Sequence, residues 1–90
     1  YKNIDSKILL KESHKLLRAK GYEVANIDAT VSAQKPKLKP FIPEMEKTMA
    51  NILSIDEAQI SVKATTTEKL GFEGREEGIS AMAVVLVSKI

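Results

Sequence analysis

Apolar residues recur with a helical period at two places along the chain, which predicts two helices. The first runs from a cap at Asp5 or Ser6 to about Lys20, where Gly21 supplies a stop. Its stripe, flanked by Ile8 and Leu10, consists of Leu9, Ser13, Leu16, Leu17 and Lys20. The second has Pro43 near its first turn, where proline is tolerated, and its stripe consists of Ile42, Met45, Met49 and Ile52.

The period changes to two in the segments that we expect to be strands. From Tyr22 onward, one face carries Ile27, Ala29, Val31 and Ala33, and the other carries Asp28, Thr30, Ser32 and Gln34. A second strand is predicted from Gln59 to Thr67. The last segment, Ile79 to Ile90, is apolar on both faces over residues 82–87. Such a strand needs cover on both sides. Two helices cover one side, so we expect the other to meet another subunit or further chain.

The order helix, strand, helix, strand, strand predicts an α+β fold, within the α/β class in its broad sense. We expect a layer sandwich, with helices on one face of a mixed sheet. A chain of 90 residues makes one domain with a modest core, which agrees with help from a partner subunit. The start at Tyr1 reads like the middle of a longer protein, either a fragment or part of one.

Composition excludes several classes of function. The net charge of +2 is too small for a protein that mainly grips nucleic acid, and two Phe, two Tyr and no Trp leave few platforms for stacking bases. The absence of cysteine excludes disulfides and thiolate metal sites. No apolar run approaches the roughly 20 residues of a membrane span. His14 is the only histidine, so without a partner ligand we expect an exposed helix residue rather than a metal site.

The run from Lys63 to Phe72 carries the strongest candidate chemistry. It places three consecutive hydroxyls, Thr65, Thr66 and Thr67, directly before Glu68 at the predicted end of a strand. Ligands tend to bind at such ends in α/β sheets. Taken alone, however, threonines are ordinary strand residues, and a glutamate between lysines is usually a solvated charge.

Residues 35–40, Lys-Pro-Lys-Leu-Lys-Pro, form a second candidate. Two prolines stiffen this connection and prevent regular pairing. A stiff loop offers fixed backbone donors and acceptors, although an exposed linker is the common alternative.

Four stretches together resemble the 2-C-methyl-D-erythritol 2,4-cyclodiphosphate synthase family. They are Ala19 to Tyr22, Ala33 to Leu38, Val62 to Phe72, and Gly74 to Ile79, and the similarity extends over essentially all 90 residues. The resemblance covers roughly the C-terminal 60 % of a typical member. It implies that the zinc-binding Asp-x-His pair, a further His and the loops that hold methylerythritol belong to an N-terminal portion absent from these residues.

The resemblance also implies roles for individual residues. Thr66 is the catalytic residue, which stabilises the transition state, and Glu68 binds the Mg²⁺ or Mn²⁺ that bridges the substrate diphosphate. Ala64, Thr65 and Thr67 belong to the same nucleotide-binding turn. Phe72 and Arg75 match substrate-contact positions, with a cavity on the trimer axis as the alternative location of Arg75. Met82 stands where some relatives have Glu near that cavity. The loop that receives cytidine comprises Ala33, Gln34, Lys35, Pro36, Lys37, Leu38 and Lys39.

The implied protein is a homotrimer, with sheets around a threefold axis and active sites between subunits. Its substrate is a cytidine diphosphate ester carrying a 2-phosphate, which attacks the β-phosphorus to form a cyclic diphosphate and release CMP. Zinc in the intact enzyme fixes the attacking phosphate. Bacterial cytoplasm is the expected compartment and a plastid the alternative. A catalytically incomplete trimer-forming or nucleotide-binding fragment is the alternative function.

Overall fold

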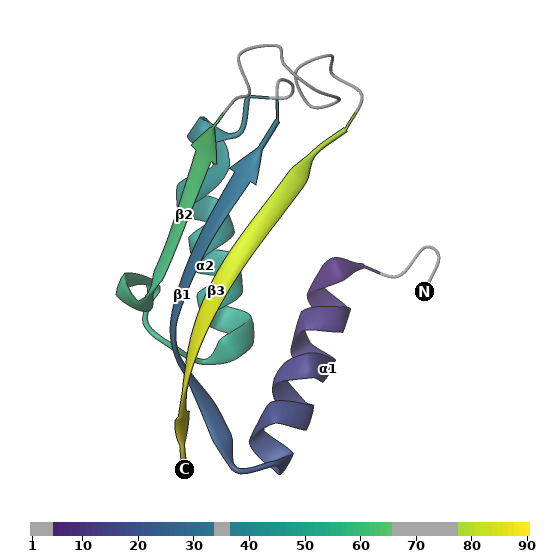
Figure 1. Cartoon of the computed structure of the whole chain (residues 1–90), viewed down its shortest axis with the longest axis vertical. Coiled ribbons are helices and arrows are strands. Elements are labelled where there is room, and N and C mark those ends of the chain that lie inside the picture. Colours follow the sequence, from purple (N-terminus) through teal and green to yellow (C-terminus); the bar gives the residue numbers. More distant parts are fainter. Residues whose placement is uncertain (1–4, 34–36, 66–77) are drawn as a thin grey trace.

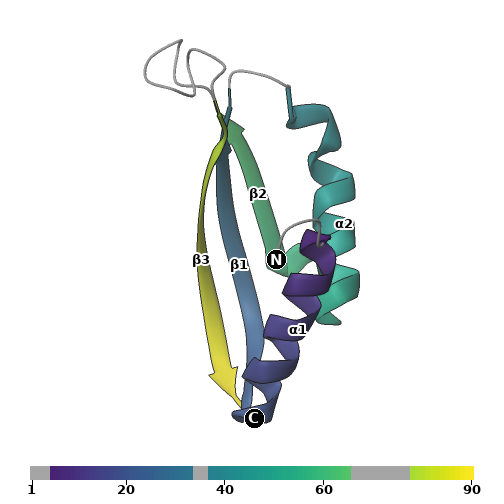
Figure 2. The ribbon, with the colours of Figure 1, turned by 90° about the vertical axis from the view of Figure 1, so that its right-hand side faces the viewer.

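The computed structural model describes residues 5–33, 37–65 and 78–90. It forms two layers, a sheet of three strands and a layer of two helices on one of its faces (Figures 1 and 2). This confirms the predicted α+β class. The helices are α1 (Ser6–Ala19) and α2 (Ile42–Leu53), with short 3₁₀ turns η1 (Lys39–Phe41) and η2 (Glu57–Gln59). The strands are β1 (Tyr22–Ser32), β2 (Ile60–Thr65) and β3 (Ser80–Lys89).

α1 begins and ends at the predicted positions. The Asp5 side chain accepts a hydrogen bond from the backbone N–H of Lys7 at 2.8 Å, which caps the helix and lowers the pKa of the Asp5 carboxyl. After the helix, Gly21 adopts φ +89°, a conformation that other residues rarely take, so the chain can reverse into β1.

The predicted apolar stripe of α1 packs against the core only in part. Leu10 and Leu17 pack against the core, whereas Leu16 of the predicted stripe is 66 % exposed. His14 shares the inward face with Leu10 and Leu17 because positions i, i+4 and i+7 line one side of a helix. It is half-buried, and its Nε2 is enclosed without a hydrogen-bond partner among the described residues. The expectation of an exposed histidine was therefore wrong.

β1 is the central strand of the order β2-β1-β3. It pairs in parallel with β2, from Ile27 opposite Ile60 to Ser32 opposite Thr65. It pairs antiparallel with β3, from Tyr22 opposite Lys89 to Ser32 opposite Ser80. The sheet is therefore mixed, as predicted, and α2 provides the crossover between the two parallel strands.

A β-bulge keeps two parts of β1 facing the same core. The register shifts between Val24 and Asn26. In a regular strand Val24 and Ile27 would point to opposite faces, but the extra residue of a bulge brings both to one side. Both are buried, in a core completed by Ala50, Leu53, Ile60 and Val62.

Gln59, predicted as a strand residue, belongs instead to η2. Its Oε1 accepts from the Asp56 N–H at 2.9 Å, and its Nε2 donates to the Ala25 carbonyl at 2.7 Å. The Gln59 side chain thus fixes the turn before β2 against the bulge of β1.

β3 remains open on both faces in the described part of the chain. Residues opposite one another in paired strands share a face, so Met82, Val84 and Leu86 lie with Thr30, Asp28 and Asn26 on the helix-free face. Met82 is 75 % exposed and Val84 69 %. On the helix side, Val85 is still 48 % exposed. The apolar character that led us to expect further cover is therefore present as exposed surface, and oligomerisation stays a prediction.

Candidate functional site

The two candidate loops begin side by side at one edge of the sheet. Because β1 and β2 are parallel, their carboxyl ends meet there, with Ser32 opposite Thr65 (Figure 1). One residue further, the N–H of Ala33 donates to the Thr65 carbonyl at 3.2 Å. The starts of the 33–39 loop and of the threonine run are thus joined by a backbone hydrogen bond.

The residues predicted for the cytidine loop differ in burial. Ala33 is buried, Leu38 is half-buried, and Lys37 and Lys39 are exposed. The Leu38 carbonyl accepts from the Phe41 N–H at 2.8 Å, so the loop passes through η1 directly into α2. Gln34, Lys35 and Pro36 lie outside the described residues.

The threonine run is described only up to Thr65, which is exposed, while Ala64 before it is half-buried opposite Val31. The remaining predicted site residues lie outside the described residues: Thr66, Thr67, Glu68, Phe72 and Arg75. The structure therefore brings together the beginnings of the predicted site, and the placement of its catalytic and metal-binding residues stays a prediction.

Ser80 joins this edge from the third strand, although no sequence pattern assigns it there. Ser80 lies opposite Ser32, and Ser32 lies opposite Thr65. Three residues with hydroxyl side chains therefore occupy adjacent positions on neighbouring strands. Antiparallel pairing places the start of β3 beside the end of β1. A serine at the start of an apolar strand carries no signal of such a neighbour.

A carboxylate from α2 reaches β2 near the same edge. The Val62 N–H donates to Glu46 Oε2 at 2.9 Å, in a half-buried setting. β2 is an edge strand, so this hydrogen bond ties its outer side to the helix. Sequence analysis assigned no role to Glu46, and nothing in the helical pattern around it indicates this contact.

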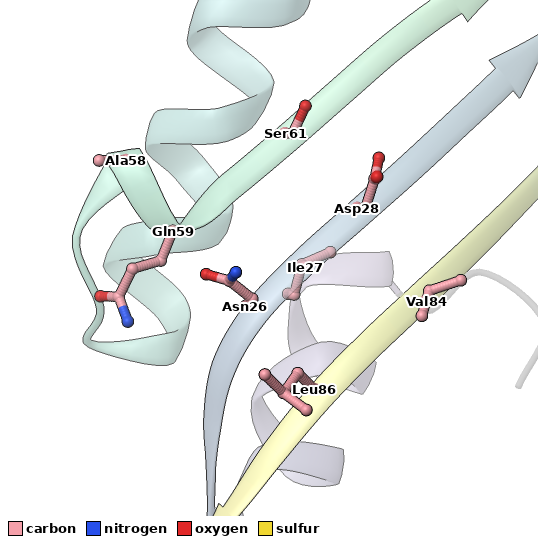
Figure 3. A pocket seen from close by; sticks show the side chains of 8 residues that line it. All are labelled: Asn26, Ile27, Asp28, Ala58, Gln59, Ser61, Val84 and Leu86. Atoms are coloured by element: carbon pink, nitrogen blue, oxygen red, sulfur yellow. The ribbon is translucent and has the colours of Figure 1, made fainter.

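A shallow hollow of about 300 Å³ on the sheet does not coincide with these loops. Figure 3 shows Asn26, Asp28, Gln59 and Ser61 facing it together with Val84 and Leu86. The hollow lies beside η2 and the start of β2, whereas the loops leave from the other end of that strand. None of the predicted site residues lines it.

The described residues offer no preformed metal centre. They contain no group of three or more His, Cys, Asp or Glu side chains able to hold a metal ion. His14 belongs to no such group, and its Nε2 is enclosed without a hydrogen-bond partner among the described residues. The described helices also include none with the length and apolar character of a membrane span.

Comparison with known proteins identifies a family. The chain matches the model of the YgbB family over residues 1–88. It is 63 % identical over 90 residues to 2-C-methyl-D-erythritol 2,4-cyclodiphosphate synthase of Parabacteroides distasonis, covering 100 % of this chain and 56 % of that protein. It is 56 % identical over 89 residues to the enzyme of the same name from a Geobacillus species, covering 99 % and 56 %. The chain thus spans just over half the length of these curated relatives.

Solved structures share the fold. The bifunctional IspDF of Campylobacter jejuni superposes with a TM-score of 0.96 at 47 % identity, over 100 % of this chain and 24 % of that one. IspF of Plasmodium falciparum, solved as a CDP complex, superposes with a TM-score of 0.88 at 38 % identity, over 94 % and 55 %.

Proposed function

Because the chain belongs to the YgbB family, we propose that its protein is a cyclodiphosphate synthase of the non-mevalonate isoprenoid pathway. The reaction is conversion of 4-diphosphocytidyl-2-C-methyl-D-erythritol 2-phosphate to 2-C-methyl-D-erythritol 2,4-cyclodiphosphate and CMP, the work of a phosphorus–oxygen lyase. The observation that carries the proposal is the hydrogen bond from Ala33 to Thr65. This hydrogen bond joins the start of the proposed cytidine loop to the start of the proposed phosphate-binding turn. A ligand that carries both a cytidine and a diphosphate needs two such segments side by side.

The proposed roles follow from the needs of phosphoryl transfer, which is mainly positioning and charge stabilisation. The loop from Ala33 to Lys39 receives the cytosine and ribose, and Lys37 supplies a cation. At the other end, the hydroxyl of Thr66 donates to a phosphate oxygen as negative charge develops on it. Ala64, Thr65 and Thr67 shape that turn, while Phe72 and Arg75 complete the contacts to substrate.

Glu68 is the residue proposed to hold Mg²⁺ or Mn²⁺, since a carboxylate with phosphate oxygens is a common ligand set for Mg²⁺. A divalent cation bound there would offset the charge of the diphosphate. Zinc is expected in the intact enzyme, but the described residues do not fit it. Its ligands are assigned to the portion of the relatives that this chain does not span.

The proposed assembly is a homotrimer, and the exposed apolar residues of β3 support a contact between copies. The relatives from Parabacteroides and Geobacillus are bacterial, and a bacterial cytoplasm is the proposed compartment, with a plastid as the alternative. A catalytically incomplete trimer-forming or nucleotide-binding fragment remains the second candidate, because the chain covers 56 % of its relative.

The test is CMP release from the 2-phosphate substrate by the complete protein, with CDP binding measured alongside by calorimetry. We expect both turnover and binding. Binding without turnover would favour the incomplete fragment, and the loss of both would overturn the assignment.

Replacing Lys37 by alanine should weaken CDP binding by about tenfold, the scale of one charge-assisted hydrogen bond. Calorimetry with CDP measures the effect. Lys47→Ala is the matched control, because it removes the same charge from an exposed site on α2. Equal CDP affinities of the Lys37 variant and the wild type would remove Lys37 from the site.

A further inference from the structure

Glu46 makes a contact that the proposed reaction does not itself use. The residue lies in the second turn of α2, and its Oε2 accepts the Val62 N–H at 2.9 Å. A hydrogen bond to an ionised acceptor is stronger than one between neutral groups. The hydrogen bond joins a helix and the edge strand of the sheet, two elements of different layers that also pack together through the apolar core (Figure 2).

α2 and β2 each adjoin one of the two segments proposed to hold the nucleotide, here called its arms. One arm is the cytidine loop, from Ala33 to Lys39, and the other is the threonine turn, which begins at Ala64. α2 continues directly from the loop that ends at Lys39, and β2 runs directly into Thr65. Val62 stands three residues before Thr65, roughly 10 Å along a strand. Glu46 stands seven residues after Lys39, again roughly 10 Å along a helix. The hydrogen bond therefore acts close to both arms.

Apolar packing and a backbone hydrogen bond already join the elements that carry the arms. Ala50 and Leu53 of α2 share a core with β2, and the N–H of Ala33 donates to the Thr65 carbonyl. Apolar packing is non-directional, whereas the hydrogen bond to Glu46 joins two specific atoms, and Glu46 lies nearer to the loop along α2 than Ala50 and Leu53 do. A nucleotide held at its base by one arm and at its diphosphate by the other would be sensitive to the offset between α2 and β2, since a small misplacement of reacting groups costs much of the rate.

We propose that Glu46 is a positioning residue, which sets the distance between residues 37–39 before α2 and Thr65 at the end of β2 by fixing how α2 lies against β2. The inference rests on the proposed function and deepens it. It assigns Glu46 no contact with substrate. The competing explanation is that the side chain merely covers an unpaired N–H on an edge strand, in which case its loss would change stability and leave the nucleotide site as it was.

Four variants of the complete protein separate these explanations. Glu46→Ala removes the hydrogen bond to Val62, Glu46→Gln keeps its length and an acceptor oxygen, and Glu46→Asp keeps the charge on a shorter side chain. Glu44→Ala is the matched control, because it removes an exposed carboxylate from the same helix. Calorimetry with CDP gives Kd, CMP release gives kcat and KM, and thermal unfolding gives Tm.

We expect Glu46→Ala to raise the Kd for CDP by about tenfold and to lower kcat by about tenfold or more. Glu46→Gln should recover most of both, and Glu46→Asp should not, because its carboxylate falls short of Val62. Glu44→Ala should stay within about twofold of the wild type. If Glu46→Ala does not fold, the contrast between Gln and Asp decides.

Three outcomes would overturn the inference. The first is a Glu46→Ala protein with lowered Tm but wild-type Kd and kcat. The second is an Asp variant as active as the Gln variant. The third is an equal loss in Glu44→Ala, which would indicate a charge effect. A wild-type protein that neither binds CDP nor releases CMP would instead remove the proposed function itself, and the inference with it.

Discussion

Replacing Glu68 by alanine is expected to abolish turnover while leaving the oligomeric state unchanged. In the proposed site this carboxylate holds the divalent cation that offsets the negative charge of the diphosphate. Two phosphate groups brought together repel each other strongly. Because the protein catalyses phosphoryl transfer mainly by positioning and charge stabilisation, it has no covalent step that would compensate for the loss of the cation. CMP release measures turnover, and sedimentation or light scattering measures the assembly.

Glu57→Ala is a suitable control for the Glu68 variant. It removes an exposed carboxylate from η2, which precedes β2, whereas the site is proposed at the end of β2. The control should release CMP at the wild-type rate. Near-normal CMP release by Glu68→Ala would contradict the assignment of Glu68 as the metal-binding residue. Recovery of the variant's rate in an excess of any monovalent salt would contradict it as well.

Replacing Thr66 by alanine should raise the barrier by about 2–4 kcal/mol, the scale for losing one preorganised donor to developing charge. Such a loss corresponds to a fall in kcat of about 30- to 900-fold. Because the donation strengthens in the transition state, KM should change much less than kcat. Steady-state kinetics of CMP release make that comparison.

Thr66→Ser supplies the matched variant, since it keeps the hydroxyl and loses only a methyl group. We expect it to retain most of the rate. A Thr66→Ala protein with an unchanged rate would remove Thr66 from the mechanism, and a serine variant as slow as alanine would indicate that packing of the methyl group matters instead.

The fold was largely predictable because caps and periods are local. Asp5 and Gly21 mark the ends of α1 in the sequence, and the alternation from Ile27 to Ala33 matches the faces of β1. The face of α1 was not predictable with the same ease. Leucines stand on two sides of that helix, and the side containing His14 turned inward because tertiary packing, rather than the apolar pattern alone, decides between them.

The location of the site was predictable only in part. The rule that ligands bind at the carboxyl ends of parallel strands points to Thr65. The pairing of Ser32 with Thr65 shows that the carboxyl ends of β1 and β2 meet there, and ligand binding at that edge stays a prediction. The contacts of Glu46 and Gln59 could not be predicted, because each joins residues distant in the sequence. A side chain that hydrogen-bonds a distant backbone group leaves no periodic trace.

The strand order carries a consequence for synthesis of the chain. β1 lies at the centre of the sheet, yet its partners come later, with Ile60 opposite Ile27 and Lys89 opposite Tyr22. Of the three described strands, a ribosome therefore makes the central one first. Until residues 80–89 emerge, the side of β1 that pairs with β3 lacks this partner, and unpaired edges of this kind invite association between nascent chains. Premature termination before β3 would cost this fold far more than its few missing residues suggest.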